Sequence, residues 1–346
     1  MNKKKIAILG LGKIGLFHLS ILTNIKEVEV VGLIDPQPSS QKTVNGMGFQ
    51  IPFYANLDEL FSKNKPDGVF ICVPPAYNAA LSQKCLENNV SVFLEKPMTA
   101  QLKDAINLNK IIESKTITHA VGYMVAYYPV FQQVKKLIIQ NAIGDIKHYS
   151  SSLLLGEVFK KQEGWRQDPK ISGGGVIPIV GSHLLFLLQD WFGMPEKVQA
   201  RCIHLFSQVE DICQAEFYHK KGFSGEYSVS WSRPGYNEMS FQIYIEGTHG
   251  FLEISENRLA LYSFDQNSCY PEGWKIWNLW DLPQLSSSLK IQFNQQGYAA
   301  QDLDFIESIG TKHQPLASWH EGLNVQKLIE TLYQSHSESG ALLSIV

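Results

Sequence analysis

Cysteine is scarce in this sequence of 346 residues: there are five, and no two of them form a C-x-x-C pair. An odd number of cysteines without paired spacing argues against a disulfide framework and against a thiolate zinc site. The histidines do not show metal-ligand spacing either. The sequence therefore predicts a reducing, cytoplasmic setting and no bound metal.

An excess of charge of one sign is also lacking, because 30 lysines and arginines face 33 aspartates and glutamates, a net charge of −3. This balance gives no electrostatic footprint for a nucleic acid or an anionic membrane, so we expect neither as a partner. Apolar runs of about 20 residues, the length of a membrane span, are missing too. The nearest run, 176–192, contains His183 and Asp190 and is interpreted as a buried helix.

Residues 1–123 alternate short β-branched runs with helical patterns, which is typical of a parallel sheet with crossover helices. The expected strands are 6–9, 28–34, 68–73, 91–94 and 118–121. The expected helices are 14–23, 57–63, 79–87 and 99–113. We expect Thr99 to cap the last of these helices. The pattern predicts a first domain of the α/β class, over residues 1–123.

Residues 124–346 show a different rhythm, because most of their probable strands follow one another without helices between them. The expected strands are 146–155, 198–205, 213–219, 225–231, 240–246, 250–253 and 259–263. The expected helices are 129–140, 176–192, 300–309 and 320–336. Consecutive strands with short turns predict an open, mainly antiparallel sheet and hence an α+β second domain. The C-terminal helix is a candidate to pack back against the first domain.

A G-x-G-x-x-G pattern stands between the first expected strand and the first expected helix, at Gly10, Gly12 and Gly15. Asp35 follows Gly15 by 20 residues, at the end of the second strand. This context predicts a doubly wound Rossmann fold with a dinucleotide pyrophosphate on the helix N-terminus. Asp35 would accept hydrogen bonds from the ribose and repel a 2′-phosphate, and Pro36 supplies no cation. NAD is therefore favoured over NADP.

A Glu95-Lys96-Pro97 sequence follows the strand 91–94, at the sheet edge where ligands bind in open α/β folds. A lysine there can donate a hydrogen bond to a substrate oxygen and help to move its proton. Taken alone, the motif favours the alternative interpretation, a solvated Glu-Lys pair in a surface loop. The residues that we expect to contact the cofactor are Gly10, Gly12, Lys13, Ile14, Gly15, Asp35, Pro74, Glu95 and Lys96.

Several further motifs accompany the glycine fingerprint and the Glu95-Lys96-Pro97 sequence, in a characteristic order along the chain. They are Gly122-Tyr123 with Tyr127-Tyr128-Pro129, Trp165 to Pro169 leading into Gly173-Gly174-Gly175 and Gly181-Ser182-His183, Glu246 to Gly250, and Glu321-Gly322-Leu323. In this order the chain resembles the glucose–fructose oxidoreductase/inositol dehydrogenase/MocA-like (Gfo/Idh/MocA) oxidoreductases over essentially its whole length. The resemblance implies a Rossmann domain followed by an open sheet for substrate binding and oligomer contacts.

The resemblance also implies NAD(P)-dependent oxidation or reduction of a hydroxyl or keto carbon in a sugar, cyclitol or sugar nucleotide. Carried over by position, Lys96 is the catalytic lysine and His183 contacts the substrate or relays its proton. The other candidate substrate residues are Tyr123, Arg166 and Ile179. Arg166 would meet an anionic group, but it reads equally as a partner of Asp168. A homodimer or homotetramer is expected.

Three positions depart from the family pattern: Ile179 stands where an acid is common, Ala126 where an arginine is common, and Asn78 where a histidine is often found. We interpret each as the loss of a polar group from the substrate cleft. A structural role without a cofactor is disfavoured, because the dinucleotide fingerprint is complete. Two other functions stay open. One is an active dehydrogenase, and the other is a catalytically weakened regulator that binds a dinucleotide or a sugar.

Overall fold

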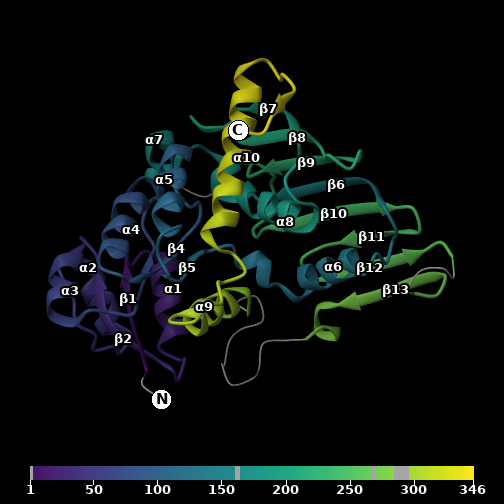
Figure 1. Cartoon of the computed structure of the whole chain (residues 1–346). Coiled ribbons are helices and arrows are strands. Elements are labelled where there is room, and N and C mark those ends of the chain that lie inside the picture. Colours follow the sequence, from purple (N-terminus) through teal and green to yellow (C-terminus); the bar gives the residue numbers. More distant parts are fainter. Residues whose placement is uncertain (1–2, 160–163, 266–269, 284–295) are drawn as a thin grey trace. The chain divides into compact units, whose positions relative to one another are not determined.

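The computed structural model describes residues 3–159, 164–265, 270–283 and 296–346. Contacts between Cα atoms divide the chain into two compact units. The first contains Met1–Met124 and Leu285–Leu323, and the second contains Val125–Gln284 and Asn324–Val346. Each unit has its own sheet (Figure 1).

The first unit is built on a five-stranded parallel sheet in the order β2-β1-β3-β4-β5. Its strands are β1 (Lys4–Leu9), β2 (Val28–Ile34), β3 (Gly68–Ile71), β4 (Ser91–Leu94) and β5 (His119–Val121). Its helices are α1 (Lys13–Leu22), α2 (Pro38–Gly46), α3 (Leu57–Asn64), α4 (Asn78–Glu87), α5 (Leu102–Ile112) and α9 (Gln296–Ser308). The predicted doubly wound Rossmann architecture is confirmed.

Two local predictions for this unit are wrong. Helix α2 was not expected, because its sequence is mostly polar and shows no apolar stripe; Pro38 at its first position starts it. Thr99 does not cap α5, because the helix begins at Leu102 and the Thr99 hydroxyl donates to the Gln101 carbonyl instead.

Helix α9 lies far along the chain from the sheet, yet its apolar side belongs to the core of the first unit. Phe305 packs edge-on against Phe70 of β3 and Phe93 of β4, with ring centroids 5.3 and 5.7 Å apart. Ala299 and Ile306 join the same cluster of buried side chains. Burial of several large side chains in this way is worth roughly 1.5–3 kcal/mol for each. The first unit is therefore completed by residues that follow the second sheet in sequence.

The second unit is built on a nine-stranded sheet in the order β13-β12-β11-β10-β6-β9-β8-β7-β14, antiparallel except where β6 runs parallel to β9. Its strands are β6 (Ile146–Leu154), β7 (Lys197–Ile203), β8 (Ile212–Tyr218), β9 (Ser224–Ser230), β10 (Ser240–Gly247), β11 (Gly250–Ile254), β12 (Arg258–Ser263), β13 (Gly273–Asn278) and β14 (Leu343–Ser344). The prediction of a mainly antiparallel sheet is confirmed. Strands β13 and β14 were not foreseen.

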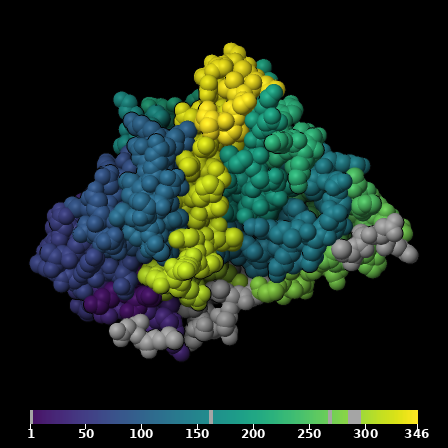
Figure 2. All heavy atoms as spheres, in the orientation of Figure 1, coloured from purple at the N-terminus to yellow at the C-terminus, as the bar shows by residue number. Residues whose placement is uncertain are grey.

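The helices of the second unit are α6 (Pro129–Ile139), α7 (Pro169–Ser172) and α8 (Ser182–Phe192), with a π-helical turn over Ile177–Gly181. Helix α10 (Trp319–Ser337) starts in the first unit and ends in the second. The stretch Pro169–Phe192, which is helical apart from a bend at 173–175, is long and apolar enough to cross a membrane. An 18-residue window of it has a mean hydropathy of 1.8, but 89% of that window is buried inside the protein. It is the core helix that the sequence predicted. Figure 2 shows the C-terminal residues in yellow at the surface, where β14 pairs with β7.

The first turn of α10 is tied to β5 by a buried histidine. His119 Nδ1 accepts a hydrogen bond from the Trp319 backbone N–H at 3.2 Å, and the Trp319 indole N–H donates to the Ala120 carbonyl at 3.0 Å. Burial lowers the pKa of His119 to about 4. The imidazole is therefore neutral in the folded protein, as its acceptor role requires.

We expect acid to destabilise the fold through His119. Because its folded pKa lies below the unfolded value of 6.5, the unfolded chain takes up a proton that the folded chain refuses. The contribution of neutral His119 to the free energy of unfolding is complete above pH 6.5. It is lost as the pH falls toward 4, at up to about 1.4 kcal/mol per pH unit. His119→Gln removes this contribution, which urea unfolding at pH 7, 6 and 5 measures. The control is His320→Gln at an exposed neighbour. Equal slopes for His119→Gln and the unmodified protein would contradict the assignment.

Candidate functional site

The candidate cofactor site begins with the glycine loop between β1 and α1. Gly10 has φ +89°, and a Cβ there would lie 2.5 Å from the Cys72 carbonyl oxygen. A Cβ on Gly15 would lie 1.9 Å from the carbonyl oxygen of Gly10. No side chain fits at either position. At Gly12 a Cβ would meet no atom within 4 Å, so the space over this residue is open.

The N-terminus of α1 suits an anion. Gly12 is the N-cap and makes no side-chain cap hydrogen bond, and the first turn carries no acidic residue. Lys13 is exposed and Ile14 is half-buried in that turn. Unpaired N–H groups and the helix dipole together favour a phosphate at such an end. The open space over Gly12 and this uncapped end fit a dinucleotide pyrophosphate.

Asp35 links the end of β2 to the glycine loop. Its Oδ2 accepts the Leu11 backbone N–H at 2.6 Å, and its Oδ1 accepts from the Gln37 N–H at 2.8 Å and the Ser40 hydroxyl at 2.9 Å. These bonds fix the carboxylate beside the loop. They occupy three of its roughly four acceptor positions, so one position is left for a ribose hydroxyl.

The other predicted residues of the first unit lie along the same edge of the sheet. Backbone hydrogen bonds between neighbouring strands continue past the strand ends. The N–H groups of Gly10, Cys72, Glu95 and Gly122 donate to the carbonyl oxygens of Ile34, Leu9, Ile71 and Leu94, respectively. Pro74 is half-buried after β3, Lys96 is half-buried after β4, and Tyr123 is buried after β5. The fold thus gathers Gly10, Asp35, Pro74, Lys96 and Tyr123 at the carboxyl ends of adjacent strands.

Asn78 corrects one interpretation of the sequence, because it is fully buried and does not line an open cleft. Its amide nitrogen lies 3.4 Å from the carbonyl oxygen of Glu95, 3.3 Å from that of Pro97 and 3.2 Å from that of Met98. This one amide group therefore holds the turn that carries Lys96, which includes the cis peptide bond Lys96–Pro97. The departure from the family pattern changes the support of the loop.

Two charged side chains of the first unit were missed by the sequence reasoning. His18 of α1 lies between two carboxylates, with Nε2 3.1 Å from Glu95 Oε1 and Nδ1 2.9 Å from Asp302 Oδ2 of α9. His18 and Asp302 are both fully buried. A histidine three residues after a glycine fingerprint was a visible signal. Its partner Asp302, 284 residues away, was not.

The candidate substrate residues of the second unit lie on one stretch of chain, 165–192. Arg166 is exposed, and its guanidinium carbon lies 5.0 Å from the centre of the Trp165 ring. The neighbouring Asp168 carboxylate caps α7 by accepting the Lys170 N–H at 2.9 Å. Ile179 lies in the π-helical turn and His183 in the first turn of α8, and both are buried. Ala126 is buried too, and its carbonyl accepts a hydrogen bond from Gln132.

A buried glutamate that the sequence reasoning missed anchors this stretch. Glu210 accepts the backbone N–H of Gly175 and of Ile177, each within 3.0 Å, and the Tyr333 hydroxyl at 2.7 Å. Burial raises the pKa of Glu210 although these donors lower it. This packing requires glycine at two positions: a Cβ on Gly174 would lie 1.8 Å from the Tyr333 hydroxyl oxygen, and a Cβ on Gly175 would lie 2.4 Å from the Glu210 carbonyl oxygen. Glu210 thus fixes the start of the helix that carries His183.

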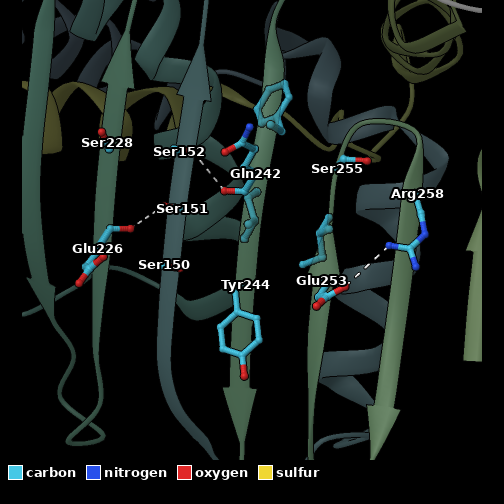
Figure 3. Close-up of a pocket in the computed structure, with 13 residues that line it drawn as sticks. Ser150, Ser151, Ser152, Glu226, Ser228, Gln242, Tyr244, Glu253, Ser255 and Arg258 are labelled. Atoms are coloured by element: carbon cyan, nitrogen blue, oxygen red, sulfur yellow. Dashed lines mark hydrogen bonds and ion pairs between the residues drawn. The ribbon is translucent and has the colours of Figure 1, made fainter. Parts of the chain in front are cut away.

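A depression of about 550 Å³ lies on the sheet of the second unit, across β9, β6, β10, β11 and β12 (Figure 3). Most of the residues that line it are polar, among them Ser150, Ser152, Ser228, Gln242 and Tyr244. At one side of the depression Arg258 forms an ion pair with Glu253 at 3.8 Å. None of the predicted site residues lines it. In the described part of the chain, no group of three or more His, Cys, Asp or Glu side chains is arranged to hold a metal ion.

Two family models match the sequence. Residues 4–123 match "Oxidoreductase family, NAD-binding Rossmann fold", and residues 131–253 match "GFO/IDH/MocA C-terminal domain". The chain belongs to the Gfo/Idh/MocA oxidoreductase family. The recognition made from the motifs is thereby confirmed, and the NAD-binding Rossmann assignment applies to the unit that carries the glycine loop.

Similar proteins fit this membership. An uncharacterized oxidoreductase of Synechocystis sp. is 22% identical, over 96% of this chain and 94% of its own length. Glucose-6-phosphate 3-dehydrogenase of Bacillus subtilis is 28% identical over 57% of each chain. An uncharacterized oxidoreductase of Schizosaccharomyces pombe is 26% identical over 57% of this chain and 54% of its own length. The chain thus spans little more than half the length of these last two relatives. A solved structure of levoglucosan dehydrogenase in complex with NADH superposes with a TM-score of 0.88 at 16% identity, covering both chains fully, and so shares the fold.

We expect Asn78→Ala to lower the free energy of unfolding by about 1–3 kcal/mol, because three buried carbonyl oxygens lose their amide donor. Gln83→Ala on the exposed side of α4 is the matched control and should change it by less than about 0.5 kcal/mol. Denaturant unfolding of the two variants measures the difference. If both variants were equally stable, Asn78 would not support the loop.

Proposed function

We propose that this protein is an NAD-dependent dehydrogenase that transfers hydride between the nicotinamide and a CH–OH carbon of a sugar, cyclitol or sugar nucleotide. One observation carries the proposal. The glycine loop, Asp35 and Lys96 lie at the carboxyl edge of one parallel sheet, joined by a continuous ladder of backbone hydrogen bonds. This edge is where open α/β sheets bind dinucleotides. The cytoplasmic location and the homo-oligomer expected from the sequence belong to the same proposal.

The residues present fit NAD better than NADP. The Asp35 carboxylate is held beside the glycine loop by three hydrogen bonds, and an acid at this place would disfavour a 2′-phosphate on the ribose. Like charges at hydrogen-bond distance would repel strongly. Gly12 leaves room for the pyrophosphate, and the first turn of α1 supplies N–H groups. Lys13, Ile14, Pro74, Glu95 and Lys96 are the other proposed contacts with the cofactor.

The bound nicotinamide would accept or donate the hydride, and the chain's own residues would handle the proton. In the oxidation direction the carbinol carbon loses a hydride and its hydroxyl loses a proton. Lys96 contacts that oxygen and takes part in the proton transfer, as a lysine at a cofactor-binding edge can do. His183 orients the substrate hydroxyl, with Tyr123 and Arg166 as further contacts. Ile179 cannot relay a proton, so the acid that is common in the family has no counterpart at this position.

The first test of this function is Lys96→Ala. We expect kcat to fall by at least about 100-fold while the NAD dissociation constant changes less than twofold, because the amine acts on the substrate oxygen. The assay follows NADH formation with glucose 6-phosphate, levoglucosan, free hexoses and cyclitols as substrates. Lys63→Ala at an exposed site is the control. A fully active Lys96→Ala enzyme would refute the role of the lysine.

A second test separates cofactor binding from folding. Gly12→Ala should weaken NAD binding at least tenfold, because its methyl group enters the open space, yet change stability by less than about 1 kcal/mol. Gly15→Ala should lower stability by about 1–3 kcal/mol or more, because its methyl group meets the Gly10 carbonyl. Calorimetric titration with NAD and thermal unfolding measure the two effects. Unchanged NAD affinity in Gly12→Ala would place the pyrophosphate elsewhere.

The buried Ile179 and Ala126 favour one alternative, a regulator of the same fold that binds dinucleotide without turnover. The same assays distinguish it. Tight NAD binding that is lost in Gly12→Ala, combined with no NADH formation on any substrate, would support the regulator over the enzyme.

A further inference from the structure

The mechanism proposed for Lys96 leaves one buried group of charges unused. It consists of Glu95, His18 and Asp302, which come from three elements of the first unit: the end of β4, α1 and α9. The His18 ring joins the two carboxylates at 3.1 and 2.9 Å. Glu95 is the residue directly before Lys96, so this group, here called the Glu95–His18–Asp302 triad, ends at the proposed catalytic loop.

The His18 ring is a cation in this environment. Burial alone would lower its pKa, but the charges and hydrogen bonds of Asp302 and Glu95 raise it to about 10. Burial raises the pKa of Asp302 to about 6, against the opposing effect of His18. The remaining neighbours are the rings of Phe70, Phe93 and Tyr298, with centroids 5.2, 5.2 and 6.1 Å from that of His18. Burial has the largest effect on the pKa of the Cys72 thiol and raises it. The negative charges of Glu95 and Asp302 raise it further. Near neutral pH the imidazolium therefore donates through both nitrogens.

The triad is connected to the backbone of Lys96. The second carboxylate oxygen of Glu95, Oε2, accepts the Lys96 N–H at 3.2 Å. On the other side the carboxylate is confined by Gly122, where a Cβ would lie 2.5 Å from Oε1. The Glu95 carboxylate is thus fixed by His18, by Gly122 and by the amide that it holds. A rotation of this carboxylate would release the amide of Lys96.

Stability alone does not account for such a group. Two carboxylates and one imidazolium are expensive to desolvate, and apolar residues of similar volume would often be at least as stable. The flanking phenylalanines show that an apolar core is available at this place. A contact to the amide of the loop lysine is what an apolar replacement would not provide.

We propose that His18 is a positioning residue for Lys96, acting through the Glu95 carboxylate, and that Asp302 keeps His18 oriented for this contact. The inference rests on the proposed function for the role of Lys96, but the placement of Lys96 is measurable without turnover. Replacing His18 by asparagine or by glutamine distinguishes its contact with Asp302 from its contact with Glu95. The Asn amide imitates the Nδ1 side of the ring that faces Asp302, and the Gln amide imitates the Nε2 side that faces Glu95.

The test is the rate at which acetic anhydride acetylates Lys96 in the intact protein without cofactor, followed by peptide mass spectrometry. In His18→Asn the Glu95 contact is lost, and we expect Lys96 to react at least threefold faster because its loop opens. In His18→Gln the contact is retained and the rate should stay within about 1.5-fold of the unmodified protein. Lys63, an exposed lysine of the same unit, is the internal reference. His313→Asn, which breaks an exposed contact to Asp304, is the matched control.

Equal Lys96 rates in His18→Asn and His18→Gln would overturn the proposal, because a purely structural role does not distinguish the two sides of the ring. If His18→Asn does not fold, Glu95→Gln serves in its place, because a neutral amide cannot accept from both His18 and the Lys96 N–H. It should also raise the rate threefold, and an unchanged rate would overturn the proposal. Turnover separates the two hypotheses: an active Lys96→Ala enzyme refutes the proposed function but leaves the labelling result standing.

Discussion

The close approach of α1 to the glycine loop is the contact on which the first unit depends. The Gly15 backbone is so near to the Gly10 carbonyl that a methyl group would overlap with it. This approach brings the start of α1 to the sheet edge and leaves the space over Gly12 open. It also places the Leu11 N–H against Asp35. The direction of α1 and the proposed phosphate and ribose contacts thus depend on one steric condition at two glycines.

In the second unit the corresponding feature is the support of a helix that is apolar on every side. Glycines at 174, 175 and 181 let this helix approach Tyr333, Glu210 and Tyr227. The Glu210 carboxylate replaces the missing acceptors at the start of the helix, since Gly175 and Ile177 have no side chain that could cap it. The two units share a feature: close backbone packing made possible by glycine and secured by one carboxylate, which is half-buried in Asp35 and buried in Glu210.

The sequence predicted the features that are encoded locally. The fingerprint at Gly10 to Gly15, the strand ends at Asp35 and Lys96, and the alternation of the second sheet all rest on neighbouring residues. The role of Asn78 was misjudged because its partners are backbone carbonyls, which carry no sequence signal. Asp302 and Glu210 were missed because their partners lie 284 and 35 residues away in the chain. The roles of Lys96 and His183 came from family resemblance and stay proposals.

The return of the chain to its first unit has a consequence for how this protein can be divided. A fragment ending after β5 would contain every residue of the proposed cofactor site. It would nevertheless lack α9, so Phe70 and Phe93 would lose the ring of Phe305 and His18 would lose the carboxylate of Asp302. The cofactor-binding half is therefore a discontinuous module. Grafting it onto another protein would require residues 3–124 and 296–323 to be carried together, with the second sheet replaced by a linker.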